Sequence, residues 1–221
     1  MRSEIAAIST KFKASPTEIR ALCSVVDFLR QFPEQLSWRG KNKPNTFTTE
    51  GIEAVAIKFY KGRRELRLSH PSTTADPAVA VVLTAAYDYE PKALDEIIKN
   101  HQYAMLAENT VGNFLERYVA SEIERFGWCW CSGDIIKATD FIKKTSNGWQ
   151  LLQIKNRNNS ENSSSSAIRN DTTIEKWFRS VAQSGKTRWD KFPELSDDLS
   201  LNEDDFLDFI KNTISTFRSQ S

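Results

Sequence analysis

The residues best suited to catalysis lie between positions 140 and 155. Asp140 opens a short apolar run, a polar turn follows, and the next apolar run ends in Gln153-Ile-Lys155. Because strand side chains alternate between faces, Gln153 and Lys155 point the same way, and Asp140 can meet them from the neighbouring strand. An acid, an amide oxygen and a lysine at one point can hold a hard cation and a water beside a phosphate. The pattern predicts cleavage of a phosphodiester.

Each of these residues has a role in such a reaction. Hydrolysis of a phosphodiester needs charge neutralisation, an aligned water and help for the leaving oxygen, and Mg²⁺ can supply much of this. Mg²⁺ prefers oxygen ligands, so we expect the Asp140 carboxylate, the Gln153 amide oxygen and the Ile154 backbone carbonyl to bind it. Lys155 would stabilise charge on the phosphate or orient the attacking water.

A further carboxylate is expected from a helix that precedes these strands. Residues 108–126 have helical spacing, and Glu116 shares its face with small and apolar side chains such as Gly112 and Val119. Such a carboxylate points into a functional cleft or is paired in the core. We predict that Glu116 binds a second cation directly or through water, and the spacing leaves open whether Glu108 or Glu116 faces the metal.

Taken singly, these residues also have ordinary structural explanations. Asp140 could cap a turn, Lys155 could be a solvated lysine at a strand end, and Glu116 could be paired with an arginine. Their order is more specific, because an acid-bearing helix, an acid-bearing strand and a strand ending in Gln-x-Lys follow one another. This order favours a nuclease.

The elements that must position the site are a helical first half and a group of strands after Gly127. Ser15-Pro16-Thr17-Glu18 is a capping box that starts a helix. After Gly127 the apolar period changes from that of helices to that of strands. Predicted helices lie at 16–31, 52–62, 76–86, 91–101, 108–126, 173–182 and 202–218, and predicted strands at 128–132, 137–142 and 149–155.

This succession predicts an α/β fold, with a mixed central sheet flanked by helices and a helical N-terminal portion. The 221 residues are enough for one large domain or two small ones. We expect a helical subdomain at 1–88, and at 89–221 a catalytic core with a DNA-recognition segment and C-terminal helices.

Composition excludes several classes of protein. Hydrophobic residues make up 39% and charged residues 27%, which is typical of a globular chain rather than a disordered one. No apolar run approaches the length of a membrane span, and no secretory signal is visible. The three cysteines have no disulfide or zinc spacing, so we expect reduced thiols in a cytoplasmic protein.

Charge is unevenly distributed along the second half. Residues 137–191 contain eleven Lys/Arg and five Asp/Glu, an excess of six positive charges. Residues 192–221 contain two Lys/Arg and seven Asp/Glu, an excess of five negative charges. The pattern fits an anionic ligand beside the predicted site, although two ordinary solvated surfaces would give the same counts.

The order of helix acid, strand acid and Gln-x-Lys resembles the PD-(D/E)xK nuclease superfamily. The resemblance implies a restriction-endonuclease-like core with Mg²⁺ as cofactor. Gln153 replaces the usual acid of the second strand, which removes one negative charge from the metal site and leaves the number of ions open. Asp140 is preceded by Thr139 rather than Pro.

A closer resemblance covers most of the second half. Residues 107–118, 127–133, 152–165 and 176–179 are similar to the SinI-type restriction endonucleases, and the run from 155 to 164 is hard to reach by chance. The first half is similar more loosely. The family implies a type II enzyme of a restriction-modification system that cuts duplex DNA at a short palindromic site of the GGWCC kind. It also implies that Asp140, Gln153 and Lys155 are the catalytic set and Glu116 the helix acid.

A polar segment at 156–173 leaves directly from Lys155. Its composition alone fits a disordered Ser-rich linker, but with the resemblance we expect it to order on DNA and read bases. Arginine can bind guanine and asparagine can bind adenine, whereas lysines and arginines after the segment are expected to bind phosphates. The predicted DNA-binding residues are Asn156, Arg157, Asn158, Asn159, Ser160, Asn162, Ser163, Arg169, Lys176, Arg179, Lys186 and Arg188.

We expect a homodimer, because a palindromic site is best matched by two-fold protein symmetry. Three alternatives remain. The chain could be a repair, resolvase or modification-dependent nuclease on the same core. It could be a DNA-binding protein without catalysis, for which Gln153 is the one hint. It could also be an interaction protein that uses its acidic C-terminal helix.

Overall fold

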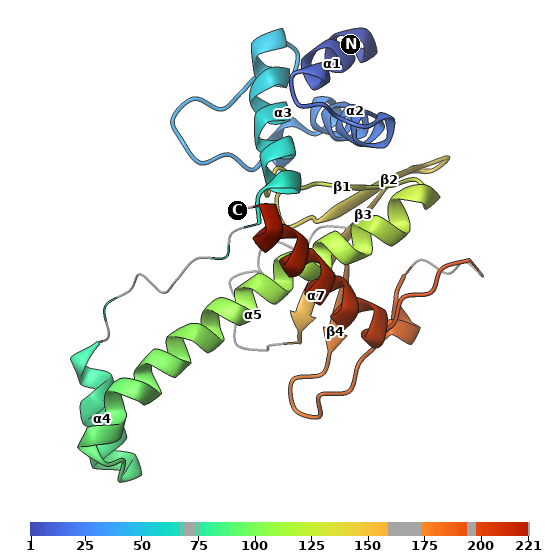
Figure 1. The fold of residues 1–221 in the computed structure, drawn as a ribbon. Helices are drawn as coiled ribbons and strands as arrows, with labels where there is room; N and C mark the ends of the chain where they lie inside the picture. Colours follow the sequence, from blue (N-terminus) through green and yellow to red (C-terminus); the bar gives the residue numbers. More distant parts are fainter. Residues whose placement is uncertain (67, 69–73, 75, 159–173, 194–197, 221) are drawn as a thin grey trace. The chain divides into compact units, whose positions relative to one another are not determined.

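The computed structural model describes residues 1–66, 68, 74, 76–158, 174–193 and 198–220. These residues fold into a four-stranded sheet accompanied by helices (Figure 1). Contacts divide the chain into two compact units, Met1–Glu65 with Leu115–Ser221, and Leu66–Phe114. All four predicted catalytic residues lie in the first unit, which is therefore the one that matters for the site.

The first unit begins with three α-helices. The predicted capping box is confirmed, because Ser15 Oγ accepts a hydrogen bond from the Glu18 N–H while the Glu18 carboxylate accepts one from the Ser15 N–H. The helix at residues 2–10 was not predicted from the sequence. The bounds are α1 Arg2–Thr10, α2 Pro16–Gln31, η1 Pro33–Gln35 and α3 Thr49–Arg64.

One long helix replaces two predicted ones. We expected helices at 91–101 and 108–126, but α5 runs unbroken as Leu94–Ile123. Residues 102–107 contain neither Gly nor Pro, so nothing ends the helix there. Gly127, with a left-handed φ of +88°, caps η3 and turns the chain toward the sheet. The neighbouring elements are α4 Pro77–Tyr87, η2 Pro91–Ala93 and η3 Glu124–Phe126.

The sheet is mixed, as predicted. Its order is β1-β2-β3-β4, with antiparallel pairing of β1 to β2 and of β2 to β3 and parallel pairing of β3 to β4. The bounds are β1 Trp128–Trp130, β2 Phe141–Thr145, β3 Gly148–Arg157 and β4 Ile174–Ser180.

Strand β4 shows that the predicted helix at 173–182 is wrong. Trp177 and Phe178 of β4 lie in register with Ile154 and Lys155 of β3. Aromatic and β-branched residues favour strands, and the hydrogen bonds of the parallel ladder decide the conformation. That ladder joins segments far apart in sequence, so local spacing could not reveal it.

The second predicted strand begins later than expected. Residues 137–140 form a turn, in which the Lys137 N–H donates to Gln35 O at 2.9 Å and Ala138 has a φ of +51°. A left-handed residue other than glycine costs on the order of 1 kcal/mol, so its surroundings must hold it. The strand starts at Phe141, and Asp140 therefore stands immediately before it.

Both faces of the sheet are covered within the first unit. On one face, Cys129 and Ile142 share a hydrophobic core with α1, α2 and α3. On the other, Trp130 reaches α5, and Phe206 of α7 (Glu203–Gln220) packs on Tyr118 and on Trp189 of η4 (Trp189–Lys191). Helices α1–α3 thus belong to the same compact unit as the sheet, and the domain boundary expected at residue 88 stays a prediction. None of the helices in the described ranges could cross a membrane.

Candidate active site

Asp140 is held at the start of β2 by backbone and side-chain hydrogen bonds. Its N–H donates to Leu152 O at 2.9 Å, and its carbonyl accepts from the Cys131 N–H at 2.8 Å. Its Oδ2 accepts from the Ile154 N–H on β3 at 2.7 Å. The carboxylate is thereby fixed against the part of β3 that carries the Gln-x-Lys sequence.

Strand β3 presents Gln153, Ile154 and Lys155 beside this carboxylate. Gln153 is buried, with 7% of its surface exposed, and Lys155 is partly buried. The N–H and C=O of one strand residue point to the same edge. The Ile154 carbonyl therefore points toward the same neighbouring strand as the N–H that binds Asp140.

Glu116 is positioned from α5 by a tryptophan of β1. Its Oε2 accepts a hydrogen bond from Trp130 Nε1 at 2.9 Å. The guanidinium groups of Arg63 and Arg117 lie 5.2 and 5.4 Å from the centre of the Trp130 ring. Arg117 also donates to the Glu65 carbonyl at 2.7 Å, so the indole contacts an arginine that is itself anchored to the backbone.

Glu116 and Asp140 repel each other in a desolvated environment. Burial raises the pKa of Glu116 to about 8, and the Asp140 carboxylate adds to the rise. Burial also raises the pKa of Asp140 to about 6, while the Ile154 hydrogen bond and the Lys155 ammonium oppose the rise. A divalent cation would stabilise the ionised forms of two such carboxylates, so the donor set fits a hard metal ion.

The carboxylates alone do not make a complete metal site. Among the residues that the structure describes, no group of three or more His, Cys, Asp and Glu side chains could hold a metal ion. A cation at Asp140 would therefore depend on amide or carbonyl oxygens and on water as well. The ligand set in which Gln153 and Ile154 supply neutral oxygens stays a prediction.

Asp134 is a site neighbour that the sequence analysis missed. It is exposed in the turn between β1 and β2, and its charge raises the pKa values of both Glu116 and Asp140. The turn packs closely on α3, since a Cβ added to Gly62 would lie 2.4 Å from Gly133 N. Gly133 has a φ of +83°, so this contact needs glycine on both sides. The sequence signal that could have revealed Asp134 is its position directly after Gly133 in the turn between the first two strands.

The predicted base-reading residues are only partly described. Asn159, Ser160, Asn162, Ser163 and Arg169 lie outside the described residues. Asn156 Oδ1 accepts from Arg179 Nε at 2.9 Å, and Asn158 Oδ1 accepts from the Ala182 N–H at 2.7 Å. Asn156 thus connects the end of β3 to β4, and Asn158 connects it to the turn after β4. Arg157, which lies between these two asparagines in the sequence, is exposed.

The predicted phosphate-binding residues divide into two groups. Lys176 and Lys186 are exposed. The Arg188 guanidinium lies 4.2 Å from the centre of the Phe178 ring, and Arg179 forms an ion pair with Glu203 and lies over Phe206. Arg179 fixes α7 to β4 and has a carboxylate partner, and its role as a phosphate contact stays a prediction.

The chain has known relatives. Residues 3–216 match the family described as SinI restriction endonuclease. The chain belongs to the SinI restriction endonuclease family. It is 45% identical over 192 residues to the type II restriction enzyme Eco47I of Escherichia coli, and 42% identical over 192 residues to the type II restriction enzyme SinI of Salmonella infantis. Each alignment covers 85% of this chain and 84% of the relative. The resemblance to the SinI-type restriction endonucleases inferred from the sequence is confirmed.

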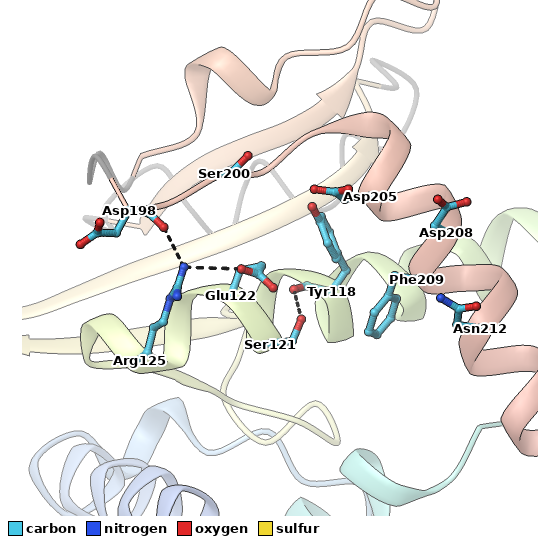
Figure 2. A pocket seen from close by; sticks show the side chains of 10 residues that line it. All are labelled: Tyr118, Ser121, Glu122, Arg125, Asp198, Ser200, Asp205, Asp208, Phe209 and Asn212. Atoms are coloured by element: carbon cyan, nitrogen blue, oxygen red, sulfur yellow. Dashed lines mark hydrogen bonds and ion pairs between the residues drawn. The ribbon is translucent and has the colours of Figure 1, made fainter.

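A second group of acids in this SinI-family protein lies between α5 and α7 (Figure 2). Glu122, Asp205 and Asp208 line a pocket of about 450 Å³, and Arg125 donates to the Asp198 carbonyl at 2.7 Å. None of the predicted catalytic residues lines this pocket. Its carboxylates would repel DNA phosphates, so we do not regard it as the DNA-binding site.

Proposed function

We propose that this protein is a type II restriction endonuclease that cleaves both strands of DNA at a short palindromic site in the presence of Mg²⁺. The observation that carries the proposal is the Asp140 carboxylate, bonded to the Ile154 N–H beside Lys155 and Glu116. Membership of the SinI family supports it, because the compared relatives are type II restriction enzymes.

The metal would be held by oxygen atoms at the start of β2 and near the end of β3. Asp140 supplies a carboxylate, Ile154 a carbonyl and Gln153 an amide oxygen, in the manner of a PD-(D/E)xK site with one acid replaced. Glu116 binds a second cation or a metal-bound water. When bound, Mg²⁺ lowers the pKa of a water and neutralises charge on the phosphate.

Lys155 acts on the phosphate and the attacking water. Its ammonium group lies close enough to Asp140 to lower the pKa of that acid against the effect of burial. In the same position it can donate to a non-bridging phosphate oxygen and stabilise the charge that develops as water attacks phosphorus.

Sequence recognition is assigned to the segment that leaves Lys155. Residues 156–173 would read base edges with their asparagine and arginine side chains, and a GGWCC-like site would favour the arginines. Lys176, Lys186 and Arg188 would bind phosphates. A palindromic site further implies a homodimer in which each chain cuts one strand.

Digestion of unmodified plasmid DNA tests the proposal. We expect discrete fragments with Mg²⁺, no cleavage with EDTA, and fragment ends that map to one short palindrome. Cleavage confined to branched or methylated DNA would instead support a repair, resolvase or modification-dependent nuclease. Tight duplex binding without cleavage under any divalent metal would support a non-catalytic DNA-binding protein.

A further inference from the structure

A loop in the N-terminal half is attached to the turn that leads into Asp140. Residues 37–43, here called the cationic loop, follow η1 and contain one arginine and two lysines. The Ser37 N–H donates to Ile135 O at 2.7 Å, and Leu36 and Ile136 form a β-bridge. These bonds hold the start of the loop against residues 134–140, the chain segment that ends at the catalytic acid.

Lys58 of α3 adds a second attachment. Its Nζ donates to the Ser37 carbonyl at 3.1 Å and to the Asp134 carbonyl at 3.0 Å. Asp134 is the acid whose charge reaches both Glu116 and Asp140. Lys58 therefore bridges the cationic loop to the immediate surroundings of the candidate active site.

The cations of this loop differ from others near the site. Arg39 and Lys41 are exposed and make no hydrogen bond or ion pair with any residue in the described ranges. By contrast, Arg63 is paired with Glu124 and Arg117 binds backbone carbonyls, so both are committed to the fold. Uncompensated cations next to a site that cleaves a polyanion are suited to phosphate contact.

We propose that the cationic loop binds the phosphodiester backbone of duplex DNA beside the scissile phosphate, with Arg39 and Lys41 as the phosphate contacts. The proposal rests on the nuclease function proposed above. Trp38, whose ring lies 5.4 Å from Lys58 Nζ, fixes the loop rather than contacting bases. The loop would position the duplex without reading its sequence, because phosphate contacts carry no base information.

The test is duplex binding by the double variant Arg39→Ala with Lys41→Ala. Binding is measured by fluorescence anisotropy with EDTA present, over a range of salt concentrations. Removing two phosphate contacts should weaken binding at low salt roughly tenfold and reduce the slope of log Kd against log salt by about 2. The charge-retaining variant Arg39→Lys with Lys41→Arg should keep most of the wild-type slope.

The matched control removes two cations that are already paired. Lys11 and Lys211 are exposed and form ion pairs with Glu53 and Asp208. The variant Lys11→Ala with Lys211→Ala should bind nearly as the wild type does. If the loop variant has the same Kd and salt slope as this control, the cationic loop is not a DNA contact. Because binding is measured without metal, the result does not depend on whether Asp140 is catalytic.

Discussion

Glu116 and Glu122 lie on the same helix but in different surroundings. Glu116 accepts a hydrogen bond from Trp130 and is close to Asp140 in a desolvated position. Glu122 lines an acidic pocket, and its side chain is 33% exposed beside Arg125. Burial and a second acid, more than the number of carboxylates, distinguish a candidate metal site from an acidic surface. Substitutions near Glu116 should therefore affect cleavage strongly, and substitutions near Glu122 should affect it little.

The largest difference in cleavage rate is expected between variants of Asp140 or Lys155 and variants of the acidic pocket. Asp140→Ala and Lys155→Ala should each lower the rate of plasmid cleavage at least ~1,000-fold, because they remove a metal ligand and the group that stabilises phosphate charge. Asp208→Ala in the pocket should change the rate less than about twofold. Wild-type cleavage by Asp140→Ala would show that the site is wrongly assigned.

A smaller contrast is expected between the two glutamates. Glu116→Gln should lower the cleavage rate roughly 10- to 100-fold, since a neighbour that orients the metal site contributes about this much. Higher Mg²⁺ should restore part of the loss. Glu122→Gln has the same change of charge on the same helix, and it should cut at the wild-type rate. Equal effects of the two variants would remove Glu116 from the site.

The free energy of unfolding should depend on pH through Glu116. The folded-state pKa of Glu116 is about 8, above its ordinary value of 4.5, so the folded protein binds this proton more tightly than the unfolded chain. Stability from this group is complete below pH 4.5 and is lost as pH rises toward 8. In EDTA at high pH, the free energy of unfolding of Glu116→Gln, measured by chemical denaturation, should therefore exceed that of the wild type by on the order of 1–3 kcal/mol. The difference should vanish at low pH.

The smallest difference is expected in stability, when a carboxylate is added either beside Asp140 or in the acidic pocket. Gln153→Glu places a third carboxylate beside Asp140 and should destabilise the metal-free protein by about 1–2 kcal/mol, with Mg²⁺ reversing the loss. Asn212→Asp adds an acid to the solvated pocket and should change stability by less than about 0.5 kcal/mol with or without Mg²⁺. Chemical denaturation in EDTA and in Mg²⁺ measures both. A Gln153→Glu variant indifferent to Mg²⁺ would place Gln153 outside the metal site.

Much of the fold followed from local signals. The capping box at Ser15, the break at Gly127 and the strand at 149–155 are encoded within a few residues, and the structure agrees with all three. The errors occurred where distant segments decide. A strand replaced the helix expected at 173–182 because β3 offered a parallel partner, and one helix replaced the two expected at 91–101 and 108–126.

For the candidate site, residue types and order predicted Asp140, Gln153, Lys155 and Glu116, because metal-assisted phosphate chemistry needs those groups on a helix and two strands. The sequence alone also revealed the family. It did not reveal that Trp130 holds Glu116, that Asp134 lies near both acids, or that the cationic loop is bonded to the turn before Asp140. These relations join residues far apart in the chain or depend on desolvation, and only the packed tertiary structure brings such groups together and removes their water.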